Sequence, residues 1–296
     1  MLSRLPGLLA VFILWLLHFL PLPALVLLGR GLGRTLHFFA RKRRQIAQRN
    51  IDLCFPELSA PERRRLTREH FALLGRSMLE RSILWWGSEA RVRRLVEMEG
   101  EEHIHAERAA GRPVILLAPH FLGLDAGGIA IAQRFDSASV YAKQNNPVFD
   151  RLLLKGRSRF GDQLLISRDD GIRPTIKAMR AGRPFYYLPD ISPRRRDAVF
   201  VPFFGIPTAT ITGLPRLAKA AGAAVLPCVT RMLPGSTGYR VTIGKAWTDF
   251  PGPDPEADAA RMNAWIEAEI RTMPSQYYWV HRRFKTRPQR GDPGLY

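Results

Sequence analysis

His120 and Asp125, in the segment APHFLGLD at 118–125, are the residues whose types and spacing best suit acid–base chemistry. His120 directly follows the apolar run PVILLA at 113–118, which predicts a buried strand, and α/β proteins place their sites at the carboxyl ends of strands. Five positions correspond to about 140° around a helix. The two side chains can therefore meet only if His120 lies on the turn and Asp125 in the first turn of the following helix. A neutral imidazole could then take a proton from a hydroxyl, while the carboxylate on its other nitrogen fixes the tautomer.

This spacing has a second interpretation, because an Asp early in a helix is often only a favourable partner of the helix dipole. The chain has no G-x-S-x-G elbow, so the pair would act without a Ser nucleophile. Cys54 and Cys228 lie in apolar surroundings without a C-x-x-C or Cys/His cluster, which supports neither a zinc site nor a disulfide framework. The main part of the chain is therefore expected to be reduced and to face the cytosol.

Strand and helix patterns alternate along the chain that carries this pair. Short apolar or β-branched runs predict strands at 113–118, 138–142, 184–188, 223–229 and 239–243. Helical patterns occur at 124–133, 147–160, 172–181, 212–221 and 256–272. A longer helix is predicted to begin at a capping box, Ser59 to Glu62, and to end at Trp85-Trp86-Gly87. The expected fold is α/β, a three-layer sandwich around a mainly parallel sheet.

The segment 5–29 contains no Asp, Glu, Lys or Arg, and roughly 20 apolar residues suffice to cross a membrane. A signal peptide is the alternative, but the stretch is too long for a usual h-region and no small-x-small cleavage site precedes the charges. Pro21 and Pro23 are predicted to break the helix near its end. Either a full span or a deeply embedded monotopic helix is compatible with this pattern.

The basic run Arg41-Lys42-Arg43-Arg44 follows this apolar segment, and such a flank favours the cytoplasmic side of a membrane. We therefore expect two parts: a membrane anchor at 1–29 and a catalytic domain at 30–296 on the cytoplasmic face. The whole chain of 296 residues carries 45 Lys and Arg against 26 Asp and Glu, a net charge of +19. This balance indicates an anionic partner: nucleic acid, an anionic membrane or a phosphorylated substrate. General solubility is the alternative explanation.

Seven ordered blocks make the chain resemble the lipid A secondary acyltransferases, the lauroyl and myristoyl transferase family of Gram-negative inner membranes. The blocks are APHFLGLD at 118–125, NNPVFD at 145–150, ISRDDGIRPTIKAMRAG at 166–182, YYLPD at 186–190, VFVPFFGIPTATITG at 199–213, GAAVLPC at 222–228 and YYWVHRRFKTRP at 277–288. The resemblance spans nearly the whole chain, and the last block is especially specific. It implies a fold like that of the glycerolipid acyltransferases.

The resemblance also assigns roles to individual residues. His120 matches the family's catalytic base and Asp125 its acidic partner. Arg168 matches an arginine associated with the phosphorylated substrate, and Asp190 matches the acid of a Pro-Asp block. Family members often carry a second acid two positions after that Asp, whereas this chain has Ser192 and then Arg194, Arg195 and Arg196.

The chemistry of the arginines fits these roles, because Arg168 and the run 194–196 are predicted to lie in loops where guanidinium groups could bind a phosphorylated sugar. A solvated loop or a contact with the membrane surface would explain the triple Arg equally well. The apolar segment VFVPFFG at 199–205 suits either a wall for an acyl chain or ordinary core.

The reaction implied is transfer of a fatty acyl chain from acyl-carrier protein to a hydroxyl of a phosphorylated lipid A precursor. It needs no metal and no bound cofactor, and the expected location is the bacterial inner membrane. Glycerol-phosphate or lysophosphatidate acylation is an alternative with the same His-x4-Asp motif, but no Glu-Gly-Thr-Arg block is present. The charge alone also suggests a nucleic-acid binder, against which the apolar N-terminal segment and the lack of a nucleic-acid-binding motif argue.

Overall fold

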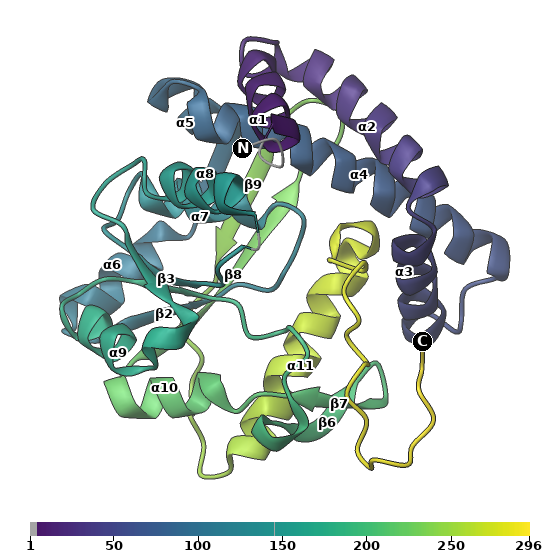
Figure 1. The fold of residues 1–296 in the computed structure, drawn as a ribbon. Helices are drawn as coiled ribbons and strands as arrows, with labels where there is room; N and C mark the ends of the chain where they lie inside the picture. The colour runs from purple at the N-terminus through teal and green to yellow at the C-terminus, as the bar shows by residue number, and fades with distance from the viewer. Residues whose placement is uncertain (1–4, 145) are drawn as a thin grey trace.

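A seven-stranded sheet forms the centre of the computed structural model, which describes residues 5–144 and 146–296 (Figure 1). The spatial order of its strands is β1-β9-β8-β2-β5-β3-β4. All neighbours in this order are parallel except β8 and β9. The predicted α/β class with a mainly parallel sheet is therefore confirmed. The strands are β1 (Val96–Glu99), β2 (Val114–Leu117), β3 (Ala138–Tyr141), β4 (Leu164–Ser167), β5 (Phe185–Tyr187), β8 (Ala224–Met232) and β9 (Tyr239–Ile243).

Helices cover both faces of this sheet. The helices are α1 (Leu5–Leu17), α2 (Leu22–Phe39), α3 (Arg41–Cys54), α4 (Ala60–Trp86), α5 (Glu89–Leu95), α6 (Glu101–Ala109), α7 (Leu124–Ala132), α8 (Pro147–Arg157), α9 (Arg173–Arg180), α10 (Gly213–Ala221) and α11 (Pro255–Thr272). Successive residues of a strand point to opposite faces. In β2, accordingly, Val114 and Leu116 join a core cluster with α5, α6 and α7, whereas Ile115 and Leu117 join a second cluster with α9, α10 and α11.

A separate antiparallel hairpin lies outside the main sheet and was not predicted. It consists of β6 (Val199–Phe203) and β7 (Ile206–Thr210), joined at Phe204 and Gly205, both of which have positive φ. Val201 and Phe203 are buried, and Phe203 belongs to the same core cluster as Trp279 and Phe284. Of the two interpretations of the segment 199–205, ordinary core is therefore the right one for these two side chains.

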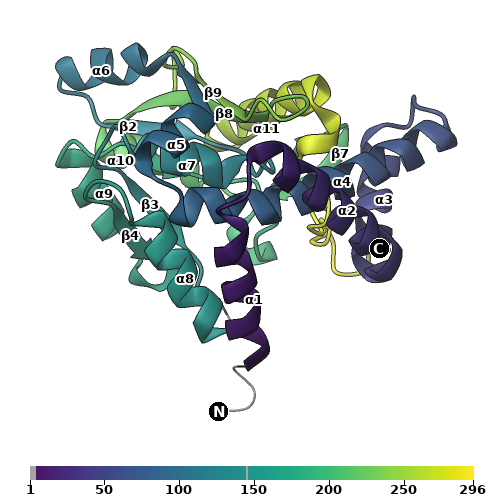
Figure 2. The same ribbon diagram turned by 90° about the horizontal axis from the view of Figure 1, so that it is seen from above.

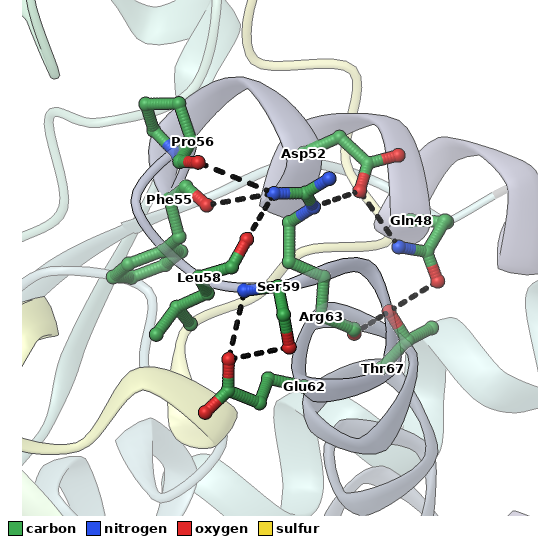
Figure 3. Close-up of polar contacts among 9 residues, drawn as sticks. All are labelled: Gln48, Asp52, Phe55, Pro56, Leu58, Ser59, Glu62, Arg63 and Thr67. Atoms are coloured by element: carbon green, nitrogen blue, oxygen red, sulfur yellow. Dashed lines mark hydrogen bonds and ion pairs between the residues drawn. The ribbon is translucent and has the colours of Figure 1, made fainter.

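The junction between α3 and α4 is held by side chains that bond to the turn (Figure 3). The predicted capping at Ser59 is confirmed, because the carboxylate of Glu62 accepts hydrogen bonds from the Ser59 backbone N–H at 2.7 Å and from its hydroxyl at 2.6 Å. The next residue of α4, Arg63, donates to Asp52 of α3 at 2.8 Å. The same guanidinium donates to turn carbonyls, those of Phe55, Pro56 and Leu58. These bonds fix α3 against α4.

The N-terminal apolar segment is folded as two helices, which confirms the break predicted at Pro21, but the membrane-anchoring helix expected within 1–29 is not supported. The first helix ends at Leu17 and the second begins at Leu22, after Pro21. With 13 residues α1 is about 20 Å long, against about 30 Å for the hydrocarbon core of a bilayer. None of the helices in residues 5–144 and 146–296 combines the length and the apolar character that crossing a membrane requires. Figure 2 shows α1 extending away from the sheet, while α2 runs beside α4.

Glycines bring α2 and α4 into close contact. A Cβ at Gly33 would lie 2.0 Å from the carbonyl oxygen of Phe71, and one at Gly75 would lie 2.3 Å from that of Gly29. Only hydrogen fits at these positions, so the two backbones touch directly. A bidentate ion pair between Arg30 and Glu69, with both bonds at 3.0 Å, adds to this contact.

Candidate active site

The backbone on both sides of His120 is fixed by neighbouring segments. Ala118, just after β2, donates to the Tyr187 carbonyl of β5 at 2.8 Å. The carbonyl of His120 accepts from the N–H of Tyr278 at 3.0 Å, so the C-terminal segment lies against the turn. His120 therefore lies at the carboxyl end of the central strand, as predicted, before the helix that starts at Leu124.

Asp190 is the carboxylate that contacts His120. One of its oxygens lies 2.6 Å from Nδ1 of the imidazole, and the other accepts the backbone N–H of His120 at 2.9 Å. Burial opposes ionisation of Asp190, but the imidazole, these hydrogen bonds and the nearby Arg283 outweigh it and lower the pKa of this carboxyl to about 2. Asp190 is thus a buried carboxylate that fixes the ring and its tautomer.

The predicted contact between His120 and Asp125 does not form. Asp125 lies in the first turn of α7, as expected, but its carboxylate binds Arg81 of α4 at 2.6 Å and Arg157 of α8 at 2.8 Å. Burial alone would raise the pKa of Asp125, yet the two guanidinium groups hold it well below its ordinary value. The prediction was wrong because two permanently charged groups, the guanidinium groups of Arg81 and Arg157, lie beside Asp125 and neutralise its charge. These ion pairs connect α7 to α4 and α8.

A small pocket with a cavity volume of about 10 Å³ lies beside the imidazole. The side chains lining it come from α3, the two strand-end loops and the C-terminal segment: Asn50, His120, Asp190, Ile191, Tyr277, Tyr278, His281 and Arg283. Ile191 and Tyr278 are 42% and 37% exposed, so they give this pocket an apolar rim. Nε2 of His120 makes no hydrogen bond within the described part of the chain. The arrangement can therefore take a proton from a hydroxyl group brought to Nε2, while Asp190 stabilises the imidazolium that forms.

Comparison with known proteins gives the class of reaction. The model of the family described as bacterial lipid A biosynthesis acyltransferase matches residues 2–286. The chain belongs to this family. It is an acyltransferase.

Curated relatives agree with this assignment. The lipid A biosynthesis lauroyltransferase of Escherichia coli (strain K12) is 37% identical over 289 residues, which cover 97% of this chain and 94% of the relative. The palmitoleoyltransferase of the same organism is 34% identical, covering 96% and 92%. The myristoyltransferase is 34% identical, covering 90% and 81%. A solved 1-acyl-sn-glycerophosphate acyltransferase from Thermotoga maritima aligns at 12% identity with a TM-score of 0.40 over 85% of this chain and 97% of that chain, too distant a likeness to carry an argument.

The arginines predicted to bind substrate lie at two places in this acyltransferase. Arg168 follows β4 and begins a short 3-10 turn, with its side chain exposed. Its strand is three positions from β2 in the sheet, which corresponds to roughly 14 Å at about 4.8 Å per strand. Among the other three, Arg195 donates to the carbonyl of Pro288 and Arg196 lies 3.6 Å from Asp197. Arg194 is exposed and makes no ion pair in residues 5–144 and 146–296.

Several pocket residues were not assigned from the sequence. His281 and Arg283 belong to the C-terminal block at 277–288, which was recognised as specific; for Arg283 the sequence left structural ion pairing and substrate contact open, and for His281 it gave no role. Arg283 is buried and donates to the Ala209 carbonyl at 2.7 Å, so it is a permanent cation close to Asp190. Asn50 of α3 donates to the carbonyls of Trp279 and His281 at 2.6 and 2.7 Å. No local motif marks Asn50, because its partners are more than 200 residues away in the sequence.

Proposed function

We propose that this acyltransferase moves a fatty acyl chain from an acyl-carrier-protein thioester to a hydroxyl of a phosphorylated lipid A precursor. The relatives named lauroyl-, palmitoleoyl- and myristoyltransferase of lipid A biosynthesis support this substrate class. The family match over nearly the whole chain also favours this function over glycerol-phosphate acylation and over nucleic-acid binding.

The observation that carries the proposal is the His120–Asp190 pair in a pocket whose lining includes no Ser or Cys. A base without a neighbouring nucleophile fits direct attack by the acceptor. His120 takes the hydroxyl proton at Nε2 as the acceptor oxygen bonds to the thioester carbon. The C–S bond then breaks, and the imidazolium returns the proton to the departing thiolate, so no acyl-enzyme forms.

Asp125 enters this proposal as a positioning residue. Its ion pairs with Arg81 and Arg157 fix the start of α7 relative to α4 and α8. Because the turn with His120 leads directly into α7, these pairs also restrain the position of the imidazole. Asp125 thus acts on the site through the backbone and not through the ring.

We further propose that exposed cations at the carboxyl edge of the sheet bind the phosphates of the acceptor. Arg168 and Arg194 follow β4 and β5, and these strands end at the same edge as β2. A phosphorylated disaccharide is long enough to contact Arg168 while one of its acyl chains reaches the imidazole. Arg195 and Arg196 are weaker candidates, since each already has a partner.

A membrane surface is the remaining partner we propose, with the catalytic domain at 30–296 on the cytoplasmic face of the bacterial inner membrane and residues 1–29 as an embedded anchor. The support is that α1, α2 and the turn between them expose large apolar side chains: Leu8, Leu9, Phe12, Ile13, Leu16, Phe19, Leu27, Leu28, Phe38 and Phe39. The basic run 41–44 follows directly, and cations beside an apolar helix favour anionic headgroups by on the order of 1 kcal/mol each.

The purified protein tests the reaction directly. Acyl transfer from acyl-carrier protein to a lipid A precursor is followed by mass spectrometry for wild type and His120→Ala. We expect the variant to lose activity by a factor of about 10²–10⁴, the usual contribution of a general base. His105→Ala is the matched control, because this His is exposed on α6 and remote from the pocket. A wild-type rate in His120→Ala would refute the proposed mechanism. If the wild-type protein forms no product with any acyl donor, the proposed substrate class is refuted.

A further inference from the structure

His281 is a second histidine in the pocket beside His120. It belongs to the C-terminal block 277–288, for which the proposed reaction so far assigns no chemical step. Its Nε2 accepts a hydrogen bond from the backbone N–H of Ser192 at 3.1 Å. Its backbone carbonyl accepts from Asn50, so both the main chain and the ring are held in place.

The bond from Ser192 fixes the tautomer of His281. A backbone N–H can only donate, so the accepting Nε2 carries no proton. Burial, together with the charges of Arg283 and its neighbours, lowers the pKa of His281 to about 4, and the ring is therefore neutral near pH 7. A neutral imidazole has one N–H, which must then be on Nδ1. This N–H makes no hydrogen bond to any of residues 5–144 and 146–296.

An N–H donor without a protein partner, fixed in the pocket that contains the base, suits an oxygen of the reacting group. We propose that Nδ1–H of His281 donates a hydrogen bond to the acyl carbonyl oxygen of the thioester and stabilises the oxyanion of the tetrahedral intermediate. This inference rests on the proposed function of the His120 site.

The proton balance of the step is simple. The acceptor oxygen bonds to the carbonyl carbon while its proton moves to Nε2 of His120, and the π electrons of the carbonyl move onto its oxygen. His281 keeps its proton throughout and only donates a hydrogen bond to that oxygen. When the carbonyl re-forms, the C–S bond breaks and His120 returns its proton to the thiolate. A neutral donor that is already oriented stabilises the oxyanion without reorganising.

A purely structural role for His281 is the competing explanation. Ser192 lies two residues after Asp190, and its hydroxyl is 3.3 Å from that of Thr286, which itself donates to the Pro193 carbonyl at 2.9 Å. The C-terminal segment thus braces the loop that contains Asp190. In this case the important atom of His281 would be Nε2, which bonds to the loop, and not Nδ1.

Two amide substitutions separate these roles. His281→Gln places an amide oxygen near the position of Nε2, so it keeps the bond from Ser192 but loses the donor at Nδ1. His281→Asn places an amide N–H near the position of Nδ1 and loses the bond to Ser192. If His281 stabilises the oxyanion, kcat falls about 10²–10³-fold in His281→Gln, with the KM values of both substrates little changed. His281→Asn keeps kcat within about tenfold of wild type.

The readouts are kcat and each KM for purified wild type, His281→Gln and His281→Asn, with thermal melting to confirm folding. His105→Gln serves as the matched control on exposed α6. Equal losses in the two variants, or a larger loss in His281→Asn, would overturn the inference and favour the bracing role. A wild-type kcat in His281→Gln would overturn it as well. His120→Ala, assayed alongside, shows whether the site itself is correct: its inactivity together with an unaffected His281→Gln would refute only the role of His281.

Discussion

Replacing Asp190 by Asn removes the negative charge of the carboxylate that contacts His120. This contact is the one that the spacing in the sequence did not predict. The side chain keeps its size, and its two polar atoms stay near Nδ1 and the backbone N–H of His120. An amide cannot act as acceptor at both contacts, so one of them must be lost or the ring must adopt the other tautomer. In that tautomer Nε2 is protonated and cannot accept the hydroxyl proton.

The size of the effect follows from these contacts. In the transition state His120 carries a positive charge 2.6 Å from the Asp190 oxygen. A hydrogen bond between charged groups contributes about 1.5–3 kcal/mol, which corresponds to roughly 10- to 150-fold in rate. The wrong tautomer adds to this loss, and the whole contribution of a general base, about 10²–10⁴-fold, sets the upper limit. We therefore expect kcat of Asp190→Asn to fall between about 10² and 10⁴-fold.

Asp125→Asn is the matched comparison, because it removes the charge of the other buried Asp near the turn. Arg81 and Arg157 would then lose their carboxylate partner. Breaking a buried pair costs about 3–5 kcal/mol, and the lower end applies because the two arginine side chains are 32% and 27% exposed. At roughly 2 °C for each 1 kcal/mol, Tm falls by about 6 °C. At assay temperatures below the lowered Tm, kcat of Asp125→Asn should stay within about tenfold of wild type.

The assay measures initial rates of acyl transfer at saturating and limiting acceptor concentration, and thermal melts of the same preparations. The expected pattern is a loss of kcat without a large loss of stability in Asp190→Asn, and the reverse in Asp125→Asn. A folded Asp125→Asn protein that has lost kcat by orders of magnitude, beside an active Asp190→Asn protein, would refute the assignment of Asp190 as the partner of His120.

Three further predictions concern the helix contact, a buried histidine and the acceptor site. Gly33→Ala places a Cβ 2.0 Å from a carbonyl oxygen of α4 and should lower the free energy of unfolding by about 1–3 kcal/mol. Gly31→Ala is the control, because a Cβ there has no atom within 4 Å and should leave stability unchanged. Thermal melts compare the two variants. Burial lowers the pKa of His70 to about 4, so the stability that its neutral form contributes is present above pH 6.5 and is lost as pH falls from 6.5 toward 4. His70→Asn should remove about 2 kcal/mol of the pH dependence between pH 7.5 and 5 in urea unfolding. Arg168→Ala should raise KM for the acceptor more than for the donor, with the exposed Arg94→Ala as its control; equal changes for both substrates would argue against a phosphate contact.

Continuous apolar runs made much of the sheet predictable from the sequence. The strand at 113–118 and the helix at 212–221 appear within one or two residues of their predicted bounds, because Gly and Pro punctuate both. The strand β4 was missed; it lies at the edge of the sheet, where its residues are partly exposed. In the apolar segment 5–29 the break at Pro21 was predicted, but the second helix, which begins at Leu22, was not.

The partner of His120 was harder to predict, because the contact joins residues 70 positions apart. Spacing within a segment identifies neighbours on one helix or turn, and it selected Asp125. The contact that forms depends instead on parallel pairing of β2 with β5, in which Ile115 is paired with Phe185. Because parallel strands end at the same edge, the residues that follow them meet there. The sequence contained this signal, since His120 and Asp190 each stand two positions after a predicted strand.

The two buried carboxylates near the turn, Asp190 and Asp125, have different partners and therefore different roles. Asp190 has the imidazole as its nearest partner, a group whose charge can change, with Arg283 as a fixed cation behind it. Asp125 has two permanent cations as partners, so its ion pairs do not change when a proton moves at His120. A carboxylate already neutralised by two guanidinium groups would stabilise an imidazolium poorly, whereas Asp190 can respond to the charge as it develops. For this reason we assign proton transfer to the His120–Asp190 pair and the stability of the turn to Asp125.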